Sequence, residues 1–77
     1  MTPHRKKEIQ KAIIRAMSAF GVDHSMQHQS MNLVGFRQMV RDIPFEELIE
    51  VLKSMEGVIF DFETNEVRIP ISYFAHS

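Results

Sequence analysis

The chain of 77 residues is predicted to form one α+β domain in which three helices are followed by a β-hairpin. Two observations support this prediction. Apolar residues recur every three or four positions as far as Gly57, as on one face of a helix, and every second position after it, as on one face of a strand. A chain of this length holds a single core, which needs nearly all of its apolar residues, 44% of the total. Residues 1–77 are therefore treated as one domain.

The first predicted helix covers residues 8–20 and has recognisable ends. Thr2 is expected to cap it, with Pro3 in the first helical position, and Gly21 is expected to end it. Its inward stripe has the spacing of one helix face and consists of Ile9, Ala12, Ile13, Ala16, Met17 and Phe20. The opposite face carries a basic ridge, one residue per turn, that consists of Lys7, Lys11 and Arg15, with Arg5 near its start.

Residues 22–32 are predicted to form a polar loop, because their polar side chains and isolated methionines follow no period; any extended piece is expected near Val22. A second helix is predicted over residues 33–41, with Asn32 or Ser30 as its cap. Its inward residues are Leu33, Phe36, Met39 and Val40. Its outward residues are Val34, Arg37, Gln38 and Arg41.

A third helix is predicted to begin at Pro44 and to end at Gly57. The residue before a proline avoids the helical region, and proline suits the first turn of a new helix, so the chain breaks here between two helices. The inward stripe of this helix consists of Phe45, Leu48, Ile49, Leu52 and Met55. Its outward residues are Glu46, Glu47, Glu50, Lys53 and Ser54.

Two strands that alternate inward and outward residues are predicted after Gly57, with a turn at Thr64 and Asn65. The inward residues of the hairpin are Val58, Phe60, Phe62, Val67, Ile69 and Ile71. Pro70 cannot donate a hydrogen bond to a neighbouring strand, so the second strand is expected to be an edge there or to pair on one side only. Three helices, a tight break between the second and the third, and a final hairpin are the order of a winged helix-turn-helix domain.

The net charge of −1 is divided unevenly along the chain. Residues 1–41 carry seven basic and two acidic side chains, a net charge of +5, whereas residues 42–77 carry two basic and eight acidic side chains, a net charge of −6. One end of the domain therefore suits anions and the other repels them.

The sequence contains no pattern typical of an active site. It lacks the motifs of hydrolases, phosphate loops, zinc proteases and dinucleotide enzymes, and it has no cysteine. His24 and His28 are close in sequence, but no third metal ligand lies near them. We therefore expect no catalysis, no cofactor and no metal. Apolar runs of four residues or fewer predict no membrane span, and no apolar segment follows the basic N-terminus, so the chain is expected to be soluble and intracellular.

Three classes of partner remain. A DNA-binding winged helix would place its third helix in the major groove, but Glu46, Glu47 and Glu50 there repel phosphates. RNA could bind the basic ridge of the first helix, although such a ridge is also the ordinary solvated face of a helix. A protein with an acidic patch could bind the outward residues of the second helix, because arginine is favoured at interfaces.

Three segments resemble the LOTUS, or OST-HTH, domain, a winged-helix module of germ-granule proteins. They are the pair Gly21-Val22, the sequence FRQMV at residues 36–40 and the sequence IPFEELIEVLKSMEGV at residues 43–58. The last segment is similar to the family pattern of a hydrophobic lead, a helix of the type Phe-x-x-Leu-x-x-x-Leu-x-Ser, a small turn and a valine-rich strand. The resemblance extends over residues 6–71.

This resemblance implies an adaptor function. Extended members of the family bind the C-terminal RecA-like lobe of a Vasa-type DEAD-box RNA helicase through the second helix and an extra C-terminal helix; minimal members are linked to RNA, including G-quadruplexes. Residues 73–77 are too few for that extra helix, which is a departure from the extended type. The helicase contact falls on Val34, Arg37, Gln38 and Arg41, and the alternative RNA contact on Arg5, Lys7, Lys11 and Arg15.

The acidic third helix favours the helicase over RNA. We therefore expect a germline scaffold that lies in the cytoplasm, in the perinuclear region or in germ granules. An RNA-binding domain is the first alternative and a DNA-binding winged helix the second. A homodimer formed by pairing at the Pro70 edge is a further alternative for the oligomeric state.

Overall fold

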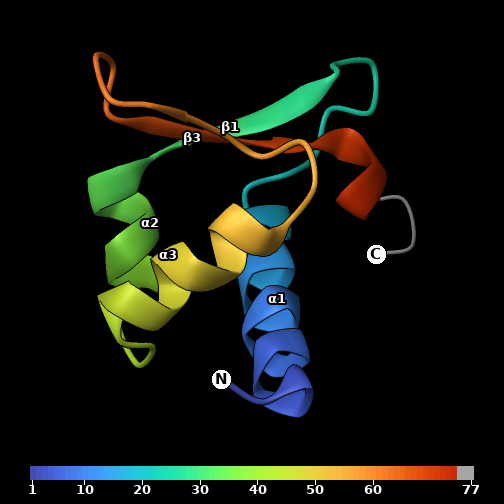
Figure 1. Cartoon of the computed structure of the whole chain (residues 1–77). Coiled ribbons are helices and arrows are strands. Elements are labelled where there is room, and N and C mark those ends of the chain that lie inside the picture. Colours follow the sequence, from blue (N-terminus) through green and yellow to red (C-terminus); the bar gives the residue numbers. More distant parts are fainter. Residues whose placement is uncertain (75–77) are drawn as a thin grey trace.

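A computed structural model describes residues 1–74 of the protein, and residues 75–77 lie outside this described part. The elements follow in the order α1 (Pro3–Ser18), β1 (His28–Asn32), α2 (Leu33–Met39), α3 (Phe45–Ser54), β2 (Ile59–Asp61), β3 (Glu66–Pro70) and the short 3-10 helix η1 (Ile71–Phe74). Figure 1 shows the sheet lying as a layer across one end of the helices. The α+β class with three helices is thus confirmed. The expectation that residues 73–77 add no further helix falls partly outside the described residues.

The first helix is longer at its start and shorter at its end than the apolar period predicts. Thr2 caps it as expected, because its Oγ1 accepts a hydrogen bond from the Arg5 N–H at 3.2 Å. The helix ends at Ser18, and Gly21 follows in the left-handed region at φ +86°. Phe20 therefore lies beyond the helix, and 67% of it is exposed, so its predicted place in the core is wrong.

The second and third helices are confirmed with small changes at their ends. Asn32 caps α2, since its Oδ1 accepts hydrogen bonds from the backbone N–H groups of Val34 and Gly35 at 2.9 and 3.3 Å. Val40 leaves the helical region at φ −115° and ψ 38°, so α2 is two residues shorter than predicted. In α3 the fully buried residues include Val51, which the predicted stripe omits.

The sheet corrects the predicted polar loop and the predicted two-stranded hairpin. Residues His28–Asn32 form β1 instead of loop, and the strand order is β1-β3-β2, all antiparallel. The β2–β3 hairpin exists, but β3 is the central strand. The strand β1 lies at an edge and only Met31, opposite Val67, is a large apolar residue in it, so no alternation marked it in the sequence.

Pro70 is accommodated at the end of the central strand. The strand β2 pairs with β3 only as far as Arg68, which lies opposite Ile59. At Pro70 the strand β3 therefore has a single neighbour, His28 of β1. Because β3 pairs on both sides over residues 66–68, the free edges of the sheet are β1 and β2, and not the strand that contains Pro70. The ring of Pro70 lies against Gly57, where an added Cβ would come within 2.8 Å of the proline Cγ.

The core lies between the helices and the inner face of the sheet. It draws on all three helices, the central strand and η1, and it consists of Ile9, Ile13, Met17, Phe36, Val40, Leu48, Val51, Leu52, Met55, Val67, Ile69 and Phe74. No polar or charged residue is fully buried among residues 1–74. The fully buried residues in this part of the chain are therefore all apolar.

Gly57→Ala is expected to lower the free energy of unfolding by about 2–4 kcal/mol, because it adds the strain of a positive φ to a clash with Pro70. Gly21→Ala is the matched control, since Gly21 has nearly the same φ of +86° but open space where the Cβ would lie. The control should lose about 1 kcal/mol, the backbone contribution alone. Urea unfolding of both variants measures the difference, and equal losses would contradict the close approach of Gly57 to Pro70.

Asp61 organises the turn of the hairpin and should contribute to stability in a pH-dependent way. The Thr64 N–H, which donates to its Oδ1 at 3.3 Å, is the main cause that holds the pKa of Asp61 below its usual value of 3.8; the Glu63 N–H and Arg68 act in the same direction. A carboxyl group whose pKa is lower in the folded chain than in the unfolded chain stabilises the fold at pH values above its unfolded pKa. This stabilisation is lost as the pH falls through the pKa of the group in the folded chain.

Asp61→Asn should therefore melt at a lower temperature than the parent chain at neutral pH, and the gap should close as the pH falls from about 5 to about 2. Asn keeps an acceptor oxygen but has no charge, so the variant isolates the ionised form. Thermal melts followed by circular dichroism give both curves. A gap that stays constant with pH would show that the charge of Asp61 has no part in the stability.

Candidate interaction surfaces

The four outward residues predicted on the second helix are all exposed. Val34, Arg37 and Gln38 lie on α2, and Arg41 follows just after its end. The spacing of three and four places Val34, Arg37 and Gln38 along one side of α2, and Arg41 lies beyond the end of the helix. These four residues are called the α2 surface below.

Arg37 is held in place by an aromatic ring of the next helix. Its guanidinium carbon lies 4.5 Å from the centre of the Phe45 ring, which is a cation–π distance. Phe45 is the first residue of α3 and 38% of it is exposed, whereas its predicted position was in the core. The break at Pro44 brings the start of α3 close to α2, so the Phe45 ring adds an apolar group to the α2 surface. The apolar period of the sequence did not predict this contact.

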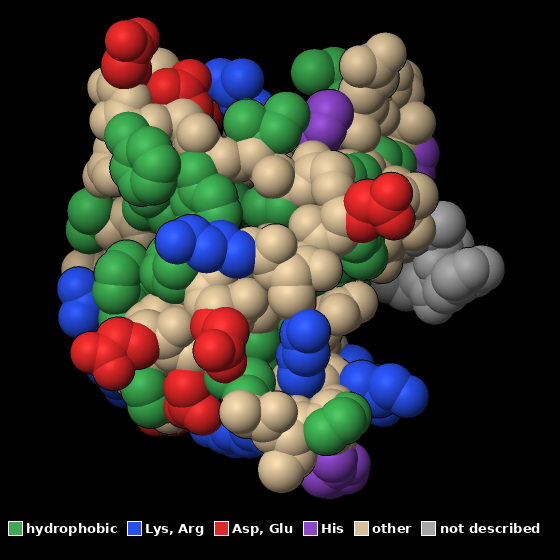
Figure 2. Space-filling view, viewed as in Figure 1, with side chains coloured by type: hydrophobic (Ala, Val, Ile, Leu, Met, Phe, Trp, Pro, Cys, Tyr) green, Lys and Arg blue, Asp and Glu red, His purple; other side chains and the backbone are tan. Residues whose placement is uncertain are grey.

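Two apolar side chains, Val34 of the α2 surface and Phe62 of the hairpin turn, are strongly exposed. Val34 is 57% exposed and Phe62 is 78% exposed, and the Phe62 ring stacks on Phe60 at 5.9 Å. Figure 2 shows hydrophobic side chains gathered from the hairpin turn to the start of α3, with a basic side chain across them. Phe62 was predicted to face the core, but the turn closed by Asp61 removes it from the strand; the spacing Asp61-x-x-Thr64 was the signal for that turn.

The charges around the α2 surface are mixed. Neither Arg37 nor Arg41 makes an ion pair with any carboxylate in residues 1–74. Glu46 and Glu50 of α3 are exposed, and Figure 2 shows acidic side chains grouped where Figure 1 places the start of this helix. A partner of the α2 surface therefore meets Arg37 on α2 and Arg41 beyond its end, which have no carboxylate partner within residues 1–74, and meets carboxylates of α3 as well.

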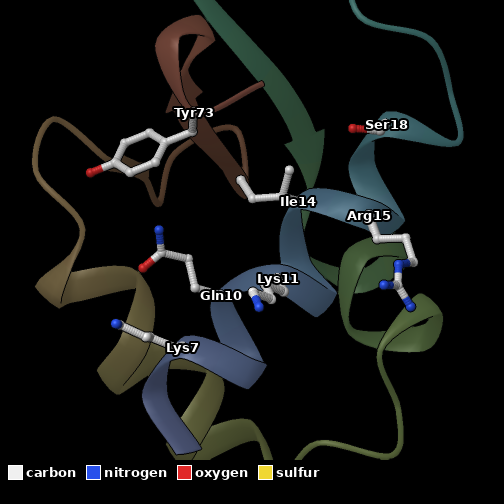
Figure 3. Close-up of a pocket in the computed structure, with 7 residues that line it drawn as sticks. All are labelled: Lys7, Gln10, Lys11, Ile14, Arg15, Ser18 and Tyr73. Atoms are coloured by element: carbon white, nitrogen blue, oxygen red, sulfur yellow. The ribbon is translucent and has the colours of Figure 1, made fainter. Parts of the chain in front are cut away.

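The basic ridge of α1 lines a groove of about 790 Å³. Its lining consists of Lys7, Gln10, Lys11, Ile14, Arg15, Ser18 and Tyr73. Tyr73 comes from η1, and its hydroxyl donates a hydrogen bond to the Glu56 carbonyl at 3.0 Å. Figure 3 shows its ring across the groove from Gln10 and Ile14, while Arg15 extends away from the ring. The Oγ of Ser18 is buried and has no hydrogen-bond partner among residues 1–74. The groove therefore brings together cations of α1 and an aromatic ring of η1, a combination that the sequence did not predict.

Arg5 belongs to a different contact. Its Nη2 lies 3.4 Å from the Glu47 Oε2 on α3, and its Nη1 lies 3.9 Å from the Glu8 Oε2. The pair with Glu47 links α1 to α3, whereas the pair with Glu8 lies within α1, and surface ion pairs of this kind contribute little to stability by themselves. Of the four residues predicted for RNA contact, the structure thus brings Lys7, Lys11 and Arg15 to one groove and directs Arg5 to α3.

The remaining sequence candidates give no site. His24 precedes β1 and His28 begins it, and no group of three or more metal-ligating side chains occurs among residues 1–74. Asp23, just before His24, closes a local turn. The Ser25 hydroxyl and the Ser25 N–H both donate hydrogen bonds to the Asp23 carboxylate and lower its pKa. Within the described part of the chain, no helix has the length and apolar character needed to cross a bilayer.

Comparisons of the chain with models of known protein families, with curated proteins and with solved structures found no match.

Proposed function

We propose that this domain is a non-catalytic protein-interaction module, a LOTUS-like winged helix that binds the C-terminal RecA-like lobe of a Vasa-type DEAD-box RNA helicase through α2. One observation carries the proposal: all four residues of the α2 surface are exposed, and the exposed Phe45 ring holds Arg37 among them. The short connection between α2 and α3 and the β2–β3 hairpin that follows them support the winged-helix part of the proposal.

The composition of this surface is that of a protein interface. Burial of exposed aromatic and aliphatic groups by a partner contributes strongly to the free energy of binding, and the exposed groups here are Phe45, Phe62 and Val34. An arginine already placed over a ring loses less side-chain entropy on binding than a free one, so Arg37 is prepared for a carboxylate of the partner. Arg37 and Arg41 have no carboxylate partner within residues 1–74, which favours a partner with an acidic patch.

The cellular part of the proposal follows from the same family resemblance. A domain that holds a helicase lobe by one small surface acts as an adaptor, which agrees with the absence of any active-site motif in the sequence. We place it in the cytoplasm, the perinuclear region or germ granules, where LOTUS-type scaffolds act.

The test is a calorimetric titration of the domain with the C-terminal lobe of a Vasa-type helicase. The double variant Arg37→Glu, Arg41→Glu should weaken binding by about a hundredfold or more, because it places two carboxylates against an acidic patch. The matched control Lys7→Glu, Lys11→Glu makes the same change in net charge on another face and should bind like the parent chain. The absence of binding by the parent chain, or an equal loss in the control, would overturn the proposal.

RNA binding through the α1 groove is the second candidate, because Lys7, Lys11 and Arg15 line it together with the Tyr73 ring. Sites that bind single-stranded nucleic acids combine cations along the phosphate backbone with an aromatic ring on which a base stacks. DNA reading by α3 receives no such support, since Glu46 and Glu50 are exposed there.

If Lys7, Lys11 and Arg15 each contact one phosphate of a single-stranded RNA, the affinity for that RNA should fall about 20-fold between about 50 and about 200 mM salt. The triple variant Lys7→Glu, Lys11→Glu, Arg15→Glu should abolish this binding, whereas Arg37→Glu, Arg41→Glu should retain most of it. Fluorescence anisotropy with single-stranded and G-quadruplex RNAs at the two salt concentrations gives the comparison. Binding that neither depends on salt nor responds to the triple variant would exclude the groove as an RNA site.

A further inference from the structure

The α1 groove has an aromatic flank and a basic flank. Successive residues of a helix turn by about 100°, so Ile14 lies about 40° from Gln10 in one direction and about 60° from Lys11 in the other. Figure 3 shows the Tyr73 ring across the groove from Gln10 and Ile14. A ligand that covers Ile14 therefore contacts the ring on one flank and a cation on the other.

The Tyr73 ring is held in place before any ligand binds. It packs against the core, and its hydroxyl donates a hydrogen bond to the Glu56 carbonyl at 3.0 Å. A fixed ring loses little entropy when a flat group stacks on it. Stacking on an aromatic side chain is how single-strand binding proteins hold successive bases. The aromatic flank therefore suits a nucleobase.

The basic flank carries charge that the described part of the chain does not neutralise. Lys7, Lys11 and Arg15 make no ion pair with a carboxylate of residues 1–74, and no acidic side chain of this part lines the groove. These cations are four residues apart, a rise of about 6 Å along the helix, which is comparable to the separation of successive phosphates in a strand. The charges and the ring together fit a polyanion that carries flat rings, which is a single-stranded nucleic acid.

Two polar groups of the groove lack a hydrogen-bond partner within residues 1–74. One is the buried Oγ of Ser18, and a buried polar group without a partner is costly until a ligand supplies one. The other is the Gln10 amide, which Figure 3 shows directed toward Tyr73. An amide is both a donor and an acceptor, and glutamine bonds in this way to the N6 and N7 atoms of adenine. The aromatic flank therefore has the group that recognises adenine.

We propose that the α1 groove binds one unpaired adenine of a single-stranded RNA. The base stacks on the Tyr73 ring and bonds through N6 and N7 to the Gln10 amide. The phosphates beside it lie on Lys7 and Lys11, while Arg15, which extends away from the ring, meets the next phosphate. This inference rests on RNA binding by the groove, the second candidate function above, and not on the helicase contact of α2. A G-quadruplex does not fit this site, because its guanines are stacked on one another and none is free to insert.

The test of adenine recognition compares oligo(A), oligo(U) and oligo(C) of equal length by fluorescence anisotropy with the 77-residue chain. Oligo(A) should bind about tenfold more tightly than the others at the same salt concentration, because adenine satisfies both groups of the Gln10 amide. Gln10→Leu should remove this preference and leave the affinity for oligo(U) unchanged. The matched control Gln38→Leu makes the same change on α2 and should keep the preference. Loss of the preference in the control as well would contradict a direct contact of Gln10.

Two substitutions test the stacking contact of Tyr73. Tyr73→Leu keeps an apolar side chain but removes the ring, so it should weaken binding of all three oligonucleotides about tenfold. Tyr73→Phe keeps the ring and loses the hydrogen bond to Glu56, so it should bind within about threefold of the parent chain. Unchanged affinity of Tyr73→Leu would overturn the proposal. Melting curves show whether this variant folds, and Gln10→Leu decides the proposal if it does not.

The remaining outcomes separate this inference from the two candidate functions. Equal binding of the three oligonucleotides, abolished by Lys7→Glu, Lys11→Glu, Arg15→Glu, would overturn adenine recognition and leave the groove as an RNA site. Tighter binding of a G-quadruplex RNA than of oligo(A) would do the same. Adenosine monophosphate should bind at least about tenfold more weakly than oligo(A), because it offers a single phosphate to the cations, and equal affinity would overturn the assignment to a strand. If no RNA binds, this inference and the RNA function fail together, while helicase binding is decided by its own titration.

Discussion

The pairing of β3 with both of its neighbours determines where the other features of this domain lie. β3 pairs with β1 along its whole length and with β2 over residues 66–68, and its inward residues Val67 and Ile69 are fully buried. The Leu33 N–H donates to the Asn65 carbonyl at 2.8 Å, so the hairpin turn holds the first residue of α2. A register slip by one residue would turn Val67 and Ile69 outward and displace α2 with them. The direction in which α2 presents its exposed side thus depends on this ladder.

The fold also redistributes the charge that the sequence divides between two halves. The ion pair of Arg5 with Glu47 joins the basic half to the acidic half where α1 packs on α3. Five other cations of the basic half are divided between the α1 groove, with Lys7, Lys11 and Arg15, and the α2 surface, with Arg37 and Arg41. A partner of α2 and a ligand of the α1 groove would therefore contact different residues. The proposed helicase binding and the alternative RNA binding would therefore respond to different substitutions.

Three phenylalanines show why the candidate surfaces were only partly visible in the sequence. Phe20, Phe45 and Phe62 fit the apolar periods of their segments, yet all three are exposed. Each lies where an element starts or has ended: Phe20 follows the end of α1, Phe45 is the first residue of α3, and Phe62 lies in the turn after β2. A period predicts orientation only while the helix or strand continues. The polar face of α2 was predictable, whereas the aromatic groups beside it were not.

The sequence by itself determined the features that depend on neighbouring residues. The caps at Thr2 and Asn32, the break at Pro44 and the hairpin after Gly57 arise from hydrogen bonds and backbone restrictions within a few positions, so the pattern of residue types is enough to predict them. Only the tertiary structure decided that β1 exists, that β3 is central and which groups meet at the candidate surfaces. An edge strand of polar residues is held by its partner strand and not by its own composition, and the surfaces combine side chains from elements that are distant in the chain.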